Sequence, residues 1–124
     1  EEIEEKITNP NLIPITDNDP EWERDNWDYD LIAKKDGAEI YVNLSSKFFK
    51  KYEEKQKKLE YKDIIRENYK LFTYFYTLFY YWEMKEKKRW GDPELNDTDE
   101  DLFNSSIKIA TVSYLSLRKP WIKI

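Results

Sequence analysis

The feature that most constrains this fold is an uncharged run of 12 residues, Leu71 to Trp82, in a chain of which 38% is charged. No glycine or proline occurs between Leu44 and Trp90, so nothing in that stretch interrupts a long helix. Within the run, apolar side chains cover the whole circumference of such a helix, which is typical of helices enclosed by other elements. We therefore expect Leu71–Trp82 to be the buried centre of a helix over residues 63–90. The run is too short to cross a membrane, which takes about 20 residues.

A second helix is predicted before this one, because Ser45 or Ser46 can cap its first turn. Two arrangements of the chain remain open beyond it. The helix continues straight to Trp90, or the chain bends near Tyr61 and a new helix begins at Asp63. The side chains that share one face of this helix, opposite a lysine-rich face, are Phe48, Phe49, Tyr52, Gln56 and Leu59.

A third helix is predicted from Thr98 to Leu117. Thr98 and Asp101 form a pair that resembles a capping box, with acidic residues in the first turn. Pro120 then marks the end of the helix. The side chains that we expect this helix to bury are Leu102, Phe103, Ile109, Ala110, Ser113 and Leu117.

Residues 27–43 form the best β candidate, because apolar and polar residues alternate on both sides of Asp36-Gly37, a strong hairpin signal. A rival interpretation is a helix that begins at Pro20 and ends at Gly37. We favour a short helical turn over Pro20–Arg24 followed by the hairpin. The predicted fold class is mainly α (α+β), a small helical bundle around the aromatic-rich helix at 63–90, with a β-hairpin near 27–43.

Pro10, Pro14 and Pro20 exclude regular helix from residues 8–20, whereas residues 1–7 could form one or two helical turns. We expect residues 1–20 to be an acidic arm or linker and residues 21–124 to form a single globular domain, a usual size for one domain.

The composition excludes several kinds of chemistry. The chain has no cysteine and no histidine, so disulfides, thiolate nucleophiles, Cys/His zinc sites and imidazole catalysis are all excluded. Asp97, Asp99 and Asp101 have the spacing of a calcium loop, but Leu102 and Lys108 stand where that loop needs glycine and glutamate. Glu39, Glu83 and Lys85 could be assembled into a metal-dependent nuclease, but such spacings occur by chance in so charged a chain. We predict no catalytic, cofactor or metal site, and therefore a protein that is not an enzyme.

Charge is segregated along the chain. Residues 1–30 hold 11 acidic and 2 basic residues, whereas residues 31–90 hold 9 acidic and 15 basic ones. Acids that alternate with tryptophans can bind a basic groove on a protein partner, with the tryptophans as anchors. The ordinary alternative is a hairpin with aromatics inward and acids outward. The candidate partner-binding residues are Glu21, Trp22, Glu23, Asp25, Trp27, Asp28 and Asp30.

The basic segment offers an alternative, nucleic-acid binding, because clustered lysines contact phosphates. The candidate residues are Lys47, Lys50, Lys51, Lys57 and Lys58. Two observations weaken this hypothesis. Lysine outnumbers arginine, the residue that reads bases, by 17 to 4, and three glutamates interrupt the patch.

The leading functional prediction is a small non-enzymatic factor that binds a protein partner. The composition resembles that of small proteins from viruses of hyperthermophilic archaea, which implies a viral accessory protein that inhibits a host protein or nucleoprotein machine in the host cytoplasm. A structural subunit, such as a virion component that associates with copies of itself, is a further alternative.

Overall fold

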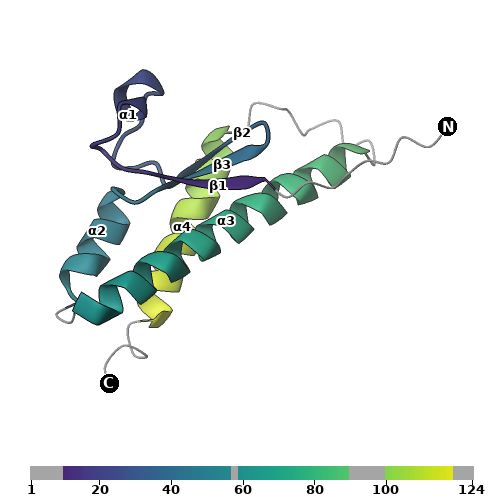
Figure 1. The fold of residues 1–124 in the computed structure, drawn as a ribbon. Coiled ribbons are helices and arrows are strands. Elements are labelled where there is room, and N and C mark those ends of the chain that lie inside the picture. The colour runs from purple at the N-terminus through teal and green to yellow at the C-terminus, as the bar shows by residue number, and fades with distance from the viewer. Residues whose placement is uncertain (1–9, 57–58, 90–99, 119–124) are drawn as a thin grey trace.

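The computed structural model describes residues 10–56, 59–89 and 100–118. They form a mainly α fold with a small sheet, which confirms the predicted class (Figure 1). The elements in chain order are β1 (Asn11–Ile15), α1 (Glu21–Arg24), β2 (Ala33–Asp36), β3 (Glu39–Asn43), α2 (Lys47–Glu54), α3 (Leu59–Arg89) and α4 (Glu100–Arg118).

The sheet has the strand order β1-β3-β2, so β3 lies in the centre. β2 pairs with β3 in the antiparallel sense, and Gly37 in the turn between them has a φ of +58°. The predicted hairpin is therefore confirmed, and the rival helix from Pro20 to Gly37 is wrong. The paired part begins at Ala33 rather than Trp27, because the Asp28 carboxylate accepts hydrogen bonds from the backbone of Asp30 (2.7 Å) and Leu31 (3.1 Å) and holds a turn there.

The strand β1 differs from what we predicted, because we expected residues 11–15 to belong to a linker without regular structure. They pair in parallel with β3, with Ile13 opposite Tyr41, and Ile15 is buried. Pro14 argued against a strand here, because proline lacks the backbone N–H that a residue in an interior strand must donate. An edge strand tolerates that loss, and β1 lies at an edge.

The described residues between Leu44 and Arg89 form two helices, α2 and α3, which resolves the alternative that the sequence left open. Ser46 caps α2, and its hydroxyl oxygen accepts a hydrogen bond from the Phe49 backbone at 3.3 Å. The second helix, α3, begins at Leu59 and not at Asp63. The two helices contact through the rings of Phe49 and Tyr69, stacked at 4.2 Å.

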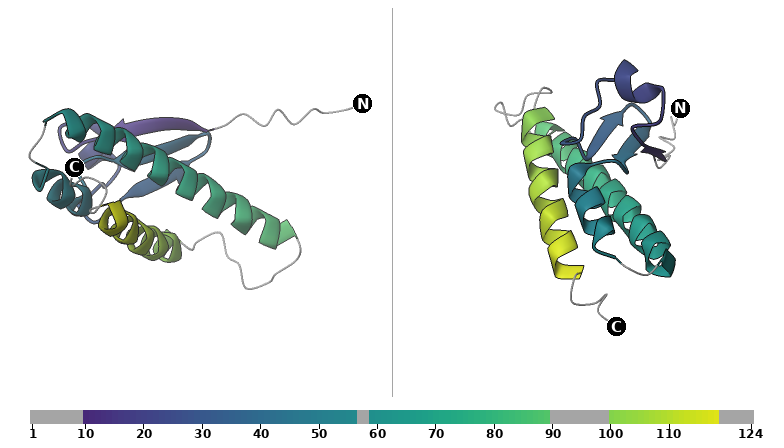
Figure 2. Two further views of the ribbon diagram at one scale, coloured as in Figure 1. Left: turned by 90° about the horizontal axis from the view of Figure 1, so that it is seen from below. Right: turned by 90° about the vertical axis from the view of Figure 1, so that its left-hand side faces the viewer.

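The three larger helices lie on one face of the sheet, and α1 lies on the other (Figures 1 and 2). Ile40 and Val42 of β3 point into the main core with Tyr69 of α3 and Ile107 of α4. The alternate residue, Tyr41, points to the opposite face. A smaller cluster there is formed by Ile15, Trp22 and Trp27, with Leu31 and Tyr41 against it.

The prediction that Leu71–Trp82 is enclosed on all sides is wrong. Only one side of this run is buried, at Thr73, Tyr74 and Thr77. Leu71, Phe75, Phe79 and Trp82 are 46%, 47%, 62% and 60% exposed. The cause is geometric, since α3 has 31 residues and spans about 46 Å at 1.5 Å per residue. Strands of at most five residues, about 17 Å long, cannot surround it.

The predicted buried face of α4 is also partly wrong. Phe103 is buried as expected, but Leu102, Ile109, Ser113 and Leu117 are exposed and Ala110 is half-buried. The buried residues follow a four-residue spacing along one row: Phe103, Ile107, Thr111 and Leu115.

Candidate protein-binding surface

One side of α3 presents large apolar side chains to solvent. They recur at three-, four- and seven-residue intervals, so they form one stripe along the helix. We call this stripe the apolar face; it consists of Ile64, Leu71, Phe75, Phe79 and Trp82. Between Leu71 and Trp82 no charged residue interrupts it.

Beside the apolar face runs a groove of about 480 Å³ between α3 and α4. Leu71, Phe75 and Phe79 form part of its lining, together with Phe72 of α3 and Tyr114 of α4. The Phe72 and Tyr114 rings stack at 4.2 Å and are nearly parallel, at 8°. A hydrogen bond between the Tyr76 and Ser106 hydroxyls also joins the two helices there. The groove is therefore held by packed rings from both helices.

On α3 and α4 some small polar residues are buried while some large apolar ones are exposed. Three threonines, Thr73, Thr77 and Thr111, are fully buried, whereas large aromatic side chains lie outside. The Thr77 hydroxyl donates to the carbonyl of Thr73 at 2.8 Å, but the hydroxyls of Thr73 and Thr111 have no hydrogen-bond partner among the residues that the structure describes. Within the aromatic run of α3, Thr73 and Thr77 therefore face the core, and Leu71, Phe75 and Phe79 face solvent.

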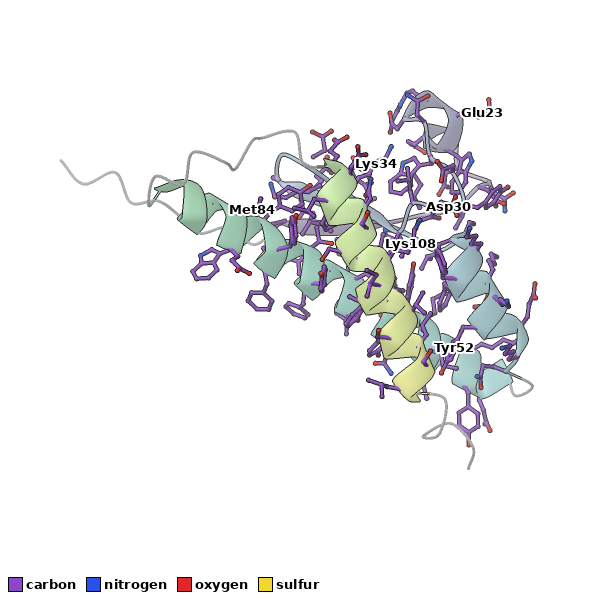
Figure 3. The ribbon with its side chains drawn as sticks, turned by 180° about the vertical axis from the view of Figure 1, so that it is seen from behind. Glu23, Asp30, Lys34, Tyr52, Met84 and Lys108 are labelled. Atoms are coloured by element: carbon purple, nitrogen blue, oxygen red, sulfur yellow. The ribbon has the colours of Figure 1, made fainter. Side chains whose placement is uncertain are left out.

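The acidic residues singled out in the sequence lie elsewhere, around α1 and the start of α2. Trp22 and Trp27 are buried, with ring centroids 6.3 Å apart, so they are not presented as anchors. Glu23, Asp28 and Asp30 are exposed, and Glu21 and Asp25 are half-buried. The two tryptophans thus point inward and three of the five acids point outward, as in the alternative interpretation, but these residues lie on α1 and in the turns before the hairpin. In Figure 3, Glu23 lies on α1 and Asp30 lies near the start of α2.

Two of these acids are already paired within the chain. Asp30 forms a salt bridge with Lys47, and that contact lowers the pKa of the Asp30 carboxyl. Asp25 pairs with Arg24 at 3.2 Å, and the hydrogen bond between the two side chains lowers the pKa of Asp25.

The lysine-rich segment is only partly a continuous helix face. Lys47, Lys50 and Lys51 are exposed on α2, whereas Lys57 and Lys58 lie outside the described residues. Lys47 is engaged with Asp30. Of the five candidate lysines, Lys50 and Lys51 therefore lie together on α2. Within the described part of the chain, neither of them forms a salt bridge with an acidic residue.

A second groove, of about 560 Å³, lies between the hairpin and the first turn of α4. Two lysines, Lys34 and Lys35, lie over aromatic rings that line this groove. The Lys34 ammonium lies 4.7 Å from the centre of the Trp27 ring, and the Lys35 ammonium lies 5.5 Å from that of Tyr81. Three acidic residues, Asp25, Asp36 and Glu100, line this groove together with the two lysines. No pattern in the sequence indicates this groove, because its walls come from segments that are far apart along the chain.

Within residues 10–56, 59–89 and 100–118, no group of three or more acidic side chains is placed to hold a metal ion. Asp97 and Asp99, considered above as a calcium loop, lie outside those ranges. Across the same described ranges, no helix combines the length and apolarity needed to span a membrane.

Comparison of the chain with protein-family models, with curated proteins and with solved structures gave no match.

The sequence did carry one signal for the apolar face. Thr73 and Thr77 recur four residues apart within the aromatic run, and the large residues Leu71, Phe75 and Phe79 fall on the other side of the helix. That spacing separates the run into a small-residue side and an aromatic side.

Proposed function

We propose that this chain is a non-enzymatic protein-binding factor that uses the apolar face of α3 and the adjoining groove. One observation carries the proposal. Four large side chains in a charge-free run are 46% to 62% exposed, while threonines on the same helix are buried. Contiguous exposed apolar surface with aromatic residues at its centre is typical of protein-binding sites.

The size of the surface supports this role. A fully buried aromatic side chain removes roughly 150–250 Å² from water. The exposed parts of the five side chains of the apolar face therefore present on the order of 500 Å² of apolar surface to solvent; these side chains are Ile64, Leu71, Phe75, Phe79 and Trp82. At about 25 cal/mol per Å², covering that area gains on the order of 10 kcal/mol. Association itself costs an estimated 4–15 kcal/mol, so a partner must present apolar surface of its own to bind stably.

The composition supports a role without catalysis. With no histidine and no cysteine, the chain lacks the side chains most used for proton transfer and nucleophilic attack near neutral pH. Inhibition of a host machine, the finer prediction from the sequence, remains a prediction.

Position-specific photocrosslinking tests the proposal. Phe79 is replaced by the photoreactive residue p-benzoylphenylalanine, and the chain is irradiated in the cells that naturally contain it. Tyr29 is the matched control, since it is an aromatic residue with similar exposure, 52%, near α1 and the small core cluster. We expect one discrete protein adduct from position 79 and none from position 29. Equal labelling at both positions, or no adduct from position 79, would refute the proposed function.

A further inference from the structure

We propose that the apolar face binds a second copy of this chain, with α3 packed antiparallel against α3 of the other copy. Each copy contributes α3 and α4, so the dimer is a four-helix bundle with a sheet on each outer side. The proposal rests on the proposed function, because it names the partner that covers the same surface.

The area fits a second copy. A partner that presents the same face contributes the same apolar surface, so the two copies together bury on the order of 1,000 Å². Specific protein interfaces begin at about that size, whereas nonspecific contacts are mostly below about 800 Å². Exposed apolar residues of α4, Ile109 and Val112, extend the surface beyond α3.

The charges beside the apolar face select the antiparallel orientation. Glu67 lies near one end of the face and Lys85 near the other, and both are exposed. They are 18 residues apart, about five helical turns, so both lie on the same side of α3. In a parallel pair Glu67 and Lys85 would stand at different levels, 18 residues or about 27 Å apart along the helix, so no contact between Glu67 of one copy and Lys85 of the other would form. An antiparallel pair places Glu67 of each copy beside Lys85 of the other, on the same flank of the apolar face, and adds two attractive contacts.

The charge pairing and the apolar packing agree on the position of the two-fold axis. Glu67 and Lys85 are equidistant from position 76. The uncharged run from Leu71 to Trp82 is centred at almost the same place, between positions 76 and 77. A single two-fold axis at this point therefore overlays the two aromatic stripes and also brings both charge pairs together. Glu67 already pairs with Lys70 at 2.6 Å, but its side chain is 63% exposed and can accept a second cation.

Charge reversal tests the orientation. Glu67→Lys and Lys85→Glu each convert both attractive contacts of a homodimer into repulsive ones. An exposed ion pair changes an equilibrium constant by a factor of about 1.5 to 5, so two pairs predict a dimer Kd raised about 2- to 30-fold in sedimentation experiments. The double variant Glu67→Lys/Lys85→Glu restores the wild-type Kd. Lys51→Glu, on the exposed side of α2, is the matched control and leaves the Kd unchanged.

Mixing the two single variants gives the sharpest result. In a mixed dimer each 67–85 contact again joins opposite charges, so native mass spectrometry should show more than the statistical half of dimers as heterodimers. Far-UV circular dichroism of each variant establishes that it is folded. A wild-type chain that sediments as a monomer at several hundred micromolar overturns the proposal, and so does a dimer indifferent to all four charge variants.

The outcomes separate this inference from the proposed function. An adduct from position 79 with twice the mass of the chain supports both. An adduct of any other mass, together with a monomer in sedimentation, overturns the second-copy assignment and leaves protein binding supported. The absence of any adduct overturns both.

Discussion

Removal of one buried hydroxyl tests how α3 is joined to the rest of the fold. Tyr69 is fully buried, and its hydroxyl donates to the carbonyl of Asn43 at 2.9 Å and lies 3.0 Å from the Ser46 hydroxyl. Tyr69→Phe keeps the ring stacked on Phe49 but leaves the Asn43 carbonyl without this donor. A lost hydrogen bond with a buried unsatisfied group costs about 1–3 kcal/mol. The melting temperature should fall by roughly 5–10 °C.

The assay is urea unfolding followed by circular dichroism, at one fixed protein concentration because association stabilises the folded state. A change below about 0.5 kcal/mol would be the size expected of a surface substitution and would refute the role assigned to Tyr69.

The same substitution has a pH signature. Burial raises the pKa of Tyr69 well above its usual value, against a smaller lowering by the hydrogen bond with Ser46. The unfolded chain ionises this tyrosine near pH 10 while the folded chain keeps it protonated, so wild-type stability falls as pH rises above about 10. Tyr69→Phe lacks this contribution and retains the other tyrosines. The stability difference between the two proteins should therefore shrink above pH 10, by up to about 1.4 kcal/mol per unit, and a constant difference would contradict the reasoning.

Two further predictions concern single positions. Thr73→Val should raise the free energy of unfolding by about 1 kcal/mol in urea titrations, because it replaces a buried hydroxyl for which the described part of the chain offers no hydrogen-bond partner. Thr77→Val, which removes a 2.8 Å hydrogen bond, is its control, and equal gains would refute the distinction. Gly37→Ala should cost about 1–2 kcal/mol although nothing lies within 4 Å of an added Cβ, because φ is +58°. Gly37→Asn should cost less, since asparagine tolerates this conformation, and a neutral Gly37→Ala would contradict the assigned turn.

Elements with local signals could be predicted from the sequence. Asp36-Gly37 specified the hairpin, Ser46 was one of two proposed caps for α2, and the acidic turn before Leu102 placed α4. These signals act over a few residues, so the chemistry of the turn or cap alone decides the outcome.

Elements that depend on distant partners could not be predicted. β1 is a strand only because β3 supplies its hydrogen bonds, and no feature of residues 11–15 shows that. The burial of Phe75 and Phe79 depends on whether a neighbour covers them, and residue type carries no such information. The burial of Trp22 and Trp27 depends on neighbours in the same way, and in this fold Ile15, Leu31 and Tyr41 cover them.

Disulfide cross-linking tests the central claim most directly, because the chain contains no cysteine and any single introduced thiol is unique. Phe75 lies beside the proposed two-fold axis, so Phe75→Cys should form a disulfide-linked dimer on mild oxidation. Ile64 is 12 residues from that axis, which places it about 36 Å from its counterpart at 1.5 Å per residue. Ile64→Cys should therefore remain monomeric under reducing-agent-free electrophoresis, as should Tyr29→Cys near α1. Equal cross-linking of Ile64→Cys and Phe75→Cys would contradict the antiparallel arrangement, and no cross-link from Phe75→Cys would contradict the apolar face as the site where two copies meet.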